Sequence, residues 1–191
     1  PTAGRLSFRE FAIPGLSRPD AKAYRRMVQM VFQDPYDSLD PRYQVGETCM
    51  EPLLVQGLCE SRDERRERAI DALQFVGLAP PEDFFYRYPH ELSGGQRQRV
   101  AIARALVLSP SFIVADEPVS MLDVSLRAGV LRLFDDWRNK SNVSIMFITH
   151  DLAVARYISD SIAVMYLGEI VESGPTDEVL LAPCHPYTRE L

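Results

Sequence analysis

Short apolar runs alternate with longer helical patterns in the second half of the chain. The runs at residues 112–115 and 144–148 are mainly apolar, and a helical pattern precedes each, at residues 93–108 and 124–140. The apolar stripe of the second helix is formed by Leu126, Val130, Phe134 and Trp137. Apolar strands that alternate with amphipathic helices are typical of parallel sheets. The pattern therefore predicts an α/β fold with a largely parallel, twice-covered sheet.

The two ends of the chain show weaker strand patterns. Residues 5–13 alternate between apolar and polar side chains, which predicts a strand with one solvated face that ends at Pro14-Gly15. Residues 27–32 form a second apolar stretch. Residues 161–173, split at Leu167-Gly168, resemble a terminal antiparallel hairpin. We therefore expect strands on both sides of the helical segments.

A helical pattern occupies residues 45–77. Within it, Ser61 followed by Glu64 resembles a capping box, and Gly77 is a stop signal. The helical spacing between them is carried by Ile70, Leu73 and Val76. Residues 80–89, rich in proline and aromatic side chains, are predicted to be a linker that returns to the main body. In the helix that follows, the side chains expected to face inward are Val100, Ala103 and Leu106 or Val107.

Composition excludes several classes of protein. The chain has 191 residues, of which 46% are hydrophobic and 25% charged, enough for one globular domain with a small subdomain. Its net charge of -6 argues against nucleic acid as the main partner. No apolar run approaches the length of a membrane span, so we expect a soluble protein. Cys49, Cys59 and Cys184 lack metal-ligand spacing and are expected to be reduced thiols.

Polar side chains follow three of the predicted strands. In open α/β sheets, ligands bind beyond the carboxyl ends of the strands. Asp116 and Glu117 follow one strand, where a bound cation would offset the cost of placing carboxylates beside an apolar run. His150 ends another strand and could contact a terminal phosphate, and the amide of Gln33 could ligate the cation. The alternatives are a solvated Asp-Glu-Pro turn, a structural histidine and an incidental glutamine.

The sharpest local signal is LSGGQ at residues 92–96. Ser93 is a good N-cap, and Gly94 and Gly95 would let a phosphate approach the backbone N–H groups at the positive end of the helix. The alternative is a glycine-loosened helix start with a solvated basic face. That face would carry Arg97, Arg99 and Arg104.

Five motifs together resemble the ATP-binding cassette (ABC) family. LSGGQRQR at residues 92–99 looks like its signature motif, FIVADE at residues 112–117 like its Walker B strand, and SMLD at residues 120–123 like its D-loop. THD at residues 149–151 matches the switch histidine, and Gln33 matches the Q-loop glutamine. The resemblance implies a P-loop NTPase-like ABC ATPase domain, with a mostly parallel sheet plus an α-helical subdomain.

The resemblance also implies roles for these residues in ATP hydrolysis with Mg²⁺ as cofactor. Glu117, His150 and Gln33 would be catalytic, and Asp116 with Gln33 would hold the Mg²⁺. A second cassette's ATP would be contacted in trans by the signature residues Ser93, Gly94, Gly95 and Gln96, with Asp123 of the D-loop nearby. The chain is thus expected to work in a pair.

Two stretches point to a subfamily. VFQDPYDSLDP at residues 31–41 and HPYTREL at residues 185–191 are similar to the importers of dipeptides, oligopeptides and nickel. The implied partners are a second ABC ATPase subunit, membrane permease subunits and, indirectly, a solute-binding protein, at the cytoplasmic face of the bacterial inner membrane. Within residues 1–191, a partial nucleotide-binding domain, we expect a helical subdomain (42–92), a catalytic core (93–183) and the start of a C-terminal extension (184–191).

Two other functions are compatible with the family. One is a non-transport ABC ATPase of nucleic-acid repair or translation, which the compact subdomain and the stretch at residues 185–187 disfavour. The other is a non-catalytic interaction fragment that binds a permease or another cassette.

The P-loop pattern G-x-x-x-x-G-K-[ST] is missing from these residues. Neither Lys22 nor Lys140, the two lysines, follows a glycine, and residues 1–5 resemble the segment that normally follows the P-loop helix. We therefore expect an N-terminal truncation that removed the first strand and the P-loop helix. Their loss should bare an apolar patch.

A polypeptide of residues 1–191 alone is predicted to show no measurable ATPase activity, because a single lost phosphate donor can cost about 10²–10³ in rate. Phosphate release assays would test this. Turnover by this polypeptide that disappears in Glu117→Gln would contradict the prediction.

Overall fold

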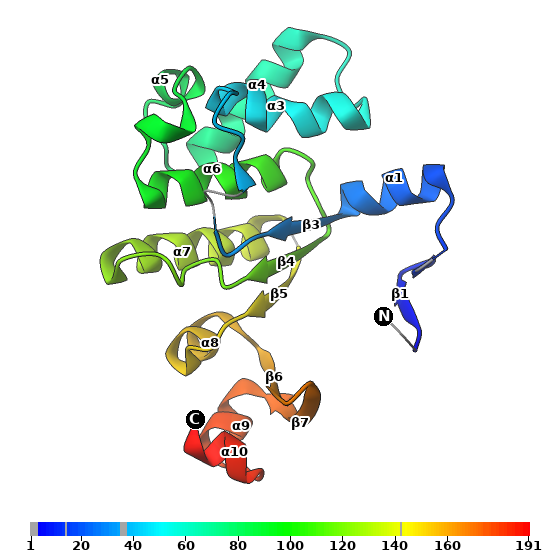
Figure 1. The fold of residues 1–191 in the computed structure, drawn as a ribbon, viewed down its shortest axis with the longest axis vertical. Helices are drawn as coiled ribbons and strands as arrows, with labels where there is room; N and C mark the ends of the chain where they lie inside the picture. Colours follow the sequence, from blue (N-terminus) through cyan, green and yellow to red (C-terminus); the bar gives the residue numbers. More distant parts are fainter. Residues whose placement is uncertain (1–3, 14, 35–37, 142) are drawn as a thin grey trace.

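Three parallel strands form the centre of the computed structural model, which describes residues 4–13, 15–34, 38–141 and 143–191 (Figure 1). The strands are β3 (Val28–Val31), β4 (Phe112–Asp116) and β5 (Ser144–Ile148), in that order across the sheet. Met30 pairs with Val114, and Val114 pairs with Met146. The predicted parallel α/β arrangement is therefore confirmed.

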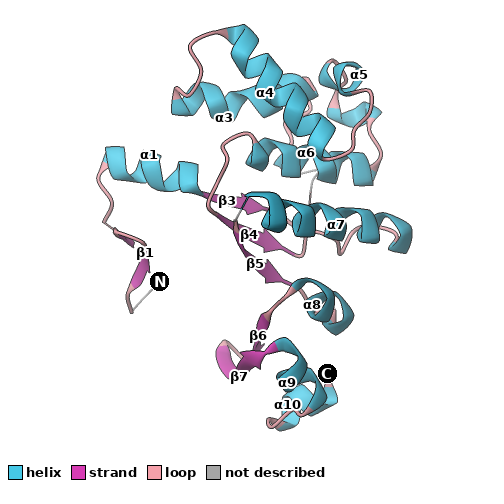
Figure 2. Ribbon diagram, turned by 180° about the vertical axis from the view of Figure 1, so that it is seen from behind, coloured by secondary structure: helices cyan, strands magenta, loops and turns pink. Residues whose placement is uncertain are grey.

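Two long helices cover one face of this sheet, as Figure 2 shows for α7. They are α6 (Gly94–Leu106) and α7 (Val124–Ser141), both at the predicted positions. Phe134 of α7 packs edge-on against Phe147 of β5, with ring centroids 5.6 Å apart. Val31 of β3 and Ala115 of β4 point to the same face and are buried. This layer, together with the helices above it, contains the main core.

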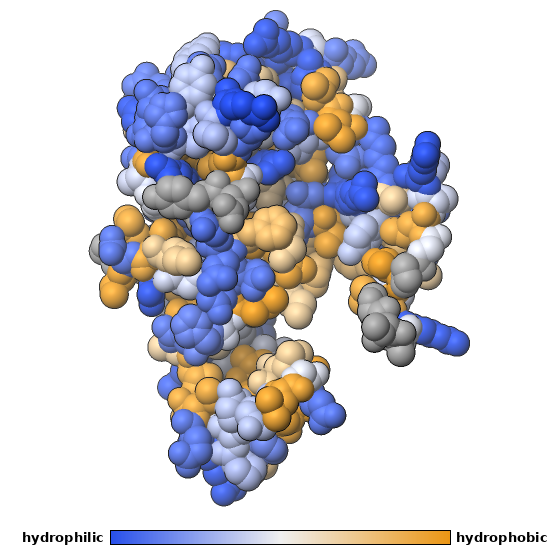
Figure 3. Space-filling model, in the orientation of Figure 1, coloured by the Kyte–Doolittle hydropathy of each residue, from blue (hydrophilic) through white to orange (hydrophobic). Residues whose placement is uncertain are grey.

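The opposite face of the sheet is open among the described residues, so the prediction of a twice-covered sheet is wrong for this chain. Met30 is 42% exposed, Met146 53% and Ile148 39%. Figure 3 shows apolar surface around a hollow between the N-terminal hairpin and the C-terminal part of the chain. The predicted bare apolar patch is thereby confirmed.

The N-terminal region differs from its prediction. Residues 5–13 form a hairpin of β1 (Leu6–Phe8) and β2 (Phe11–Ile13) instead of one strand, because the chain turns at Arg9, whose φ is 50°. Pro14 and residues 1–3 lie outside the described residues. Helix α1 (Arg18–Met27) was not predicted, since it is short and rich in charged side chains and none of its residues is fully buried.

Three helices form a unit above α6 (Figure 1). They are α3 (Val45–Gln56), α4 (Arg62–Phe75) and α5 (Pro81–Phe85), followed by a 3₁₀ turn, η1 (Pro89–Glu91). The predicted linker is wrong at α5, where Phe84 and Phe85 enter the core. Ser61 caps α4 as predicted, but the Glu64 carboxylate accepts the N–H of Glu60 and so does not close the box on Ser61.

The three arginines of α6 bind backbone carbonyls and do not form the alternative solvated basic face. Their acceptors are the carbonyls of Pro89 for Arg97, Val76 for Arg99 and Ser38 for Arg104. Arg104 also pairs with Glu51 of α3 at 3.3 Å. These contacts fix α6 to the helical unit. As predicted, Val100, Ala103 and Val107 are buried, while Leu106 is partly buried.

The C-terminal part begins with α8 (Leu152–Ile158) and continues through β6 (Ser161–Tyr166) and β7 (Glu169–Pro175). These two strands form the predicted hairpin, with Leu167 and Gly168 at positive φ in the turn. Helices α9 (Thr176–Leu181) and α10 (Pro186–Glu190) end the chain. The Glu172 carboxylate accepts the N–H groups of Cys184 and His185, which lower its pKa and fasten α10 to the hairpin.

All three cysteines are free, as expected. Burial raises the pKa of Cys49 to about 12, so its thiol stays protonated at neutral pH. In the part of the chain that the structure describes, no helix is both long and apolar enough to cross a membrane.

We predict that Gly46→Ala destabilises the helical unit. An added Cβ at Gly46 would lie 2.5 Å from the ring of Phe85, which is rigid and buried. Overpacking of this kind costs about 1–3 kcal/mol, measurable by urea unfolding followed by circular dichroism. Gly94→Ala is the matched control, because its Cβ would meet no atom within 4 Å. Equal unfolding midpoints for Gly46→Ala and the wild type would contradict the prediction.

Candidate functional site

Glu117 follows β4 in a strained backbone conformation. Its φ of 43° is left-handed, which costs a non-glycine residue on the order of 1 kcal/mol. Its N–H donates to the carbonyl of Ile148 at 3.0 Å, which continues the pairing of β4 with β5. Its own carbonyl accepts the N–H and the Oγ–H of Ser120, at 3.1 and 2.9 Å. Bonds on both sides of the residue therefore hold the strained turn.

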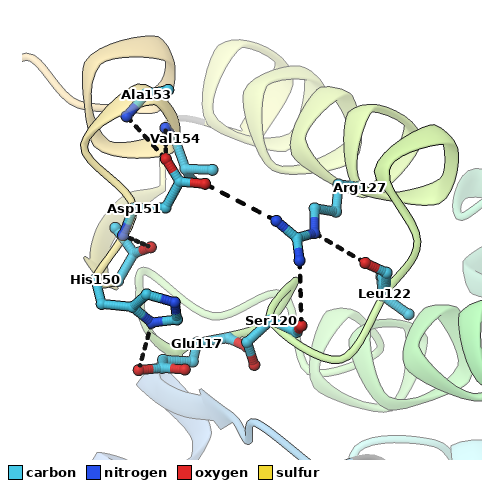
Figure 4. A network of polar contacts seen from close by, with 9 residues as sticks. Glu117, Ser120, Leu122, Arg127, His150, Asp151, Ala153 and Val154 are labelled. Atoms are coloured by element: carbon cyan, nitrogen blue, oxygen red, sulfur yellow. Dashed lines mark hydrogen bonds and ion pairs between the residues drawn. The ribbon is translucent and has the colours of Figure 1, made fainter.

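The Glu117 carboxylate lies between two polar side chains. Nε2 of Gln33 donates to Oε2 at 3.1 Å. On the other side, Nδ1 of His150 lies 3.1 Å from Oε1, and Figure 4 shows this second contact. An ionised carboxylate only accepts hydrogen bonds, so in the tautomer that fits this contact His150 donates through Nδ1. The glutamate side chain is 25% exposed and the histidine 75%. The site is thus a cluster open to solvent at one edge of the sheet.

This cluster confirms the predicted convergence of the strand ends. Gln33 lies two residues beyond β3, Glu117 one residue beyond β4 and His150 two residues beyond β5. The parallel pairing places all three at the same edge.

Asp116 is the last residue of β4 and is half-buried. Within the described ranges, its carboxylate makes no hydrogen bond or ion pair. The same residues contain no group of three His, Cys, Asp or Glu side chains that could hold a metal ion by themselves. A cation here would therefore need further oxygen ligands from a bound molecule or water.

The turn at residues 93–96 caps α6. The Ser93 hydroxyl accepts the N–H of Gln96 at 3.3 Å, and the Gln96 side chain accepts the N–H of Ser93 at 3.0 Å. The two glycines differ, since Gly94 faces open space while a Cβ on Gly95 would lie 2.9 Å from Leu126 of α7. Gly94 thus leaves the turn accessible, and Gly95 permits close packing of the helices.

The cap and the Glu117 cluster are separate. Figure 1 shows that α6 begins at the same side of the molecule at which the parallel strands end. Over the described residues, however, no hydrogen bond or ion pair joins the turn at residues 93–96 to Gln33, Glu117 or His150.

Residues 120–123 connect the cluster to α7. Met121 is 65% exposed, and Leu122 is buried. The carbonyl of Asp123 accepts the N–H groups of Leu126 and Arg127, at 2.9 and 3.0 Å, and so starts the helix. The side chain of Asp123 lies at the surface.

Sequence reasoning missed Arg127, which joins two loops of the site. Its Nε donates to the carbonyl of Leu122 at 2.8 Å and its Nη2 to that of Ser120 at 3.4 Å. Its Nη1 lies 3.8 Å from Oδ2 of Asp151, the residue after His150 (Figure 4). No pattern in the sequence marks this arginine, because two of its partners are backbone carbonyls.

A groove of about 380 Å³ lies on another side, between β3 and the helical unit. Its lining includes Arg25, Met30, Phe32, Glu51, Val55 and Arg104. Residues 35–37, part of the stretch that suggested a subfamily, lie outside the described residues.

Curated relatives match the whole chain. It is 48% identical over 191 residues to the di/tripeptide transport ATP-binding protein DppF of Pseudomonas aeruginosa, covering 100% of this chain and 58% of that protein. It is 50% identical over 192 residues to the probable peptide ABC transporter ATP-binding protein y4tS of Sinorhizobium fredii, covering 100% of this chain and 53% of the relative. The chain thus spans little more than half the length of these relatives.

Solved structures share the fold. The ATP-binding cassette MJ0796, in a dimeric post-hydrolysis state bound to ADP and Pi, gives a TM-score of 0.81 at 31% identity, with 92% of this chain and 75% of that chain covered. CbiO1 of Clostridium perfringens, part of the ABC transporter complex cbiONQ, gives 0.81 at 29% identity, with 95% and 70% covered. The family model for ABC transporters matches residues 1–120. By that match, and by whole-chain relatives at about half identity, this chain belongs to the ABC transporter family.

Proposed function

We propose that the protein containing this chain is the ATP-hydrolysing subunit of an importer for dipeptides, oligopeptides or related solutes such as nickel. The names of the relatives support transport of peptides. The observation that carries the hydrolytic part is the Glu117 carboxylate held between Gln33 and His150 at the ends of three parallel strands. Such an arrangement suits a base that orients a water molecule against a bound phosphate.

Each residue of the cluster has a distinct part in this proposal. Glu117 accepts a proton from the attacking water, and His150, which is mostly exposed, contacts the terminal phosphate with the ring nitrogen that does not face Glu117. Gln33 fixes the carboxylate with its amide N–H and keeps its carbonyl oxygen for another ligand. Catalysis of this type depends on positioning and electrostatics.

Mg²⁺ fits the oxygen donors that remain. The Asp116 carboxylate has no partner among the described residues, and Gln33 offers a carbonyl oxygen. Mg²⁺ commonly takes one or two protein oxygens and completes its shell with phosphates and water, so a three-residue protein cluster is not needed. When bound, it would neutralise charge on the phosphates.

We further propose that ATP is shared between two subunits. The accessible turn formed by Ser93, Gly94, Gly95 and Gln96 presents free N–H groups of a helix N-terminus, which suit a phosphate. Because no hydrogen bond or ion pair among the described residues joins this turn to the Glu117 cluster of its own subunit, it would serve the ATP of the partner, with Asp123 nearby. The dimeric state of MJ0796 supports this arrangement.

The remaining partners follow from the layout of the chain. In the proposed layout, residues 42–92 form a helical subdomain, residues 93–183 the catalytic core and residues 184–191 the start of an extension. The groove between β3 and the helical unit would receive a membrane permease subunit at the cytoplasmic face of the bacterial inner membrane. A solute-binding protein would then choose the cargo.

We predict that Glu117→Gln in the full-length gene product lowers kcat for ATP hydrolysis by about 10²-fold or more while ATP still binds. The amide preserves the shape of the side chain but cannot take up a proton. Phosphate release and nucleotide titration would measure the two effects. Glu169→Gln is the matched control, because Glu169 lies exposed at the start of β7, outside the site. Undiminished turnover in Glu117→Gln would count against the assignment.

If two subunits share ATP, the mass of the protein in solution should depend on the bound nucleotide. Glu117→Gln should run as a dimer in light scattering with Mg-ATP and as a monomer with ADP, since unhydrolysed ATP keeps the two subunits closed. Adding Gly94→Asp should abolish the dimer by placing a carboxylate against the phosphates, whereas adding Gly94→Ala should not, because that position faces open space. A mass independent of nucleotide would refute the shared site.

A further inference from the structure

Glu117 and His150 are linked by a second route besides their direct contact. Glu117 binds Ser120 through its carbonyl, and the carbonyl of Ser120 accepts a hydrogen bond from Arg127. Arg127 faces Asp151, which follows His150 in the chain. Contacts therefore lead from Glu117 through Ser120 and Arg127 to Asp151, the neighbour of His150 in the chain, and His150 contacts Glu117 directly. Figure 4 shows these residues.

Arg127 contacts the loop after β4 and the loop after β5 in different ways. On the β4 side, Arg127 grips the loop by two backbone carbonyls, of Leu122 and Ser120. On the β5 side, Asp151 divides its two oxygens. Oδ1 caps α8 by accepting the N–H groups of Ala153 and Val154, at 2.9 and 3.2 Å, and Oδ2 faces Arg127.

An arginine suits this place for a geometric reason. Its planar guanidinium presents donors in several fixed directions, so it can reach two carbonyls and a carboxylate at once, which a lysine cannot. The Arg127 side chain is 35% exposed and that of Asp151 37%, so solvent screens their ion pair at 3.8 Å. The two carbonyls therefore fix the guanidinium, and Asp151 aligns against it.

We propose that Arg127 is a positioning residue that sets the distance between the loop carrying Glu117 and the loop carrying His150. This inference rests on the proposed function, because it matters for catalysis only if that pair acts on ATP. Arg127 itself points to the two loops and to no part of the phosphate-binding turn at residues 93–96. Its loss should therefore disturb the geometry of the reacting groups more than the affinity for nucleotide.

The first test compares three variants of the full-length gene product in steady-state ATP hydrolysis. We expect Arg127→Met to lower kcat about tenfold and change KM for ATP less than about twofold. Arg127→Lys should recover only part of kcat, since lysine keeps the charge but lacks the planar guanidinium that reaches several acceptors at once. Arg138→Met is the matched control, because Arg138 also lies on α7 and also binds a carbonyl and carboxylates, of Ile158, Asp135 and Asp160, away from the site. A kcat for Arg127→Met within twofold of the wild type would overturn the proposal, as would a defect confined to KM.

A double-mutant cycle tests the link to Asp151. Asp151→Asn removes the charge that faces Arg127 but leaves a side chain that still caps α8. If the two residues act as one unit, Arg127→Met combined with Asp151→Asn is no slower than the slower single variant. If the losses in kcat of the two single variants multiply in the double variant, the proposed link between Arg127 and Asp151 is wrong.

A readout independent of turnover separates this inference from the proposed function. Hydrogen exchange with mass spectrometry should show faster exchange at residues 119–123 and 150–154 in Arg127→Met, and no change there in Arg138→Met. Unchanged exchange at both segments would overturn the positioning role, whatever the activity. Wild-type protein without Glu117-dependent turnover, together with faster exchange in Arg127→Met, would instead defeat the proposed function and retain the loop linkage.

Discussion

The parallel register of β3, β4 and β5 is the constraint on which the site depends. Because Val31 pairs with Ala115 and Asp116 pairs with Ile148, the three strands end at nearly the same level. Three segments far apart in sequence thereby bring an amide, a carboxylate and an imidazole together without a long loop. The strain at Glu117 is compatible with this arrangement, because its N–H extends the β-ladder while its side chain turns out of the sheet.

The two faces of the sheet are covered unequally. Helices α6 and α7 pack on one face and share a core, and arginines of α6 bind carbonyls of the helical unit. The opposite face keeps Met30 and Met146 exposed. The Glu117 cluster lies at the edge between the two faces, where its side chains remain open to solvent.

Sequence patterns predicted the strands and their polar ends because both follow from short-range rules. These patterns failed where tertiary contacts decide the structure of a segment or the role of a residue. The pattern of the strands predicted two covered faces, since Met146 looks the same in a covered strand as in an open one, and only the missing P-loop pattern predicted the bare apolar patch. The turn at Arg9 lacks glycine or asparagine, and α1 is short, rich in charged side chains and without a fully buried residue. Arg127 was invisible because its position on a helix says nothing of the loop carbonyls within its reach.

The separation of the cap of α6 from the Glu117 cluster favours the two-subunit site over a site closed within one chain. Arg97 and Arg99 hold α6 to the helical unit, and Gly95 lies so close to α7 that an added Cβ would be 2.9 Å from Leu126. These contacts tie the cap of α6 to the helical unit and to α7, and no hydrogen bond among the described residues ties it to the Glu117 cluster. In the proposed mechanism, a phosphate bound at Ser93 meets a carboxylate supplied by another molecule, so catalysis there would depend on dimerisation.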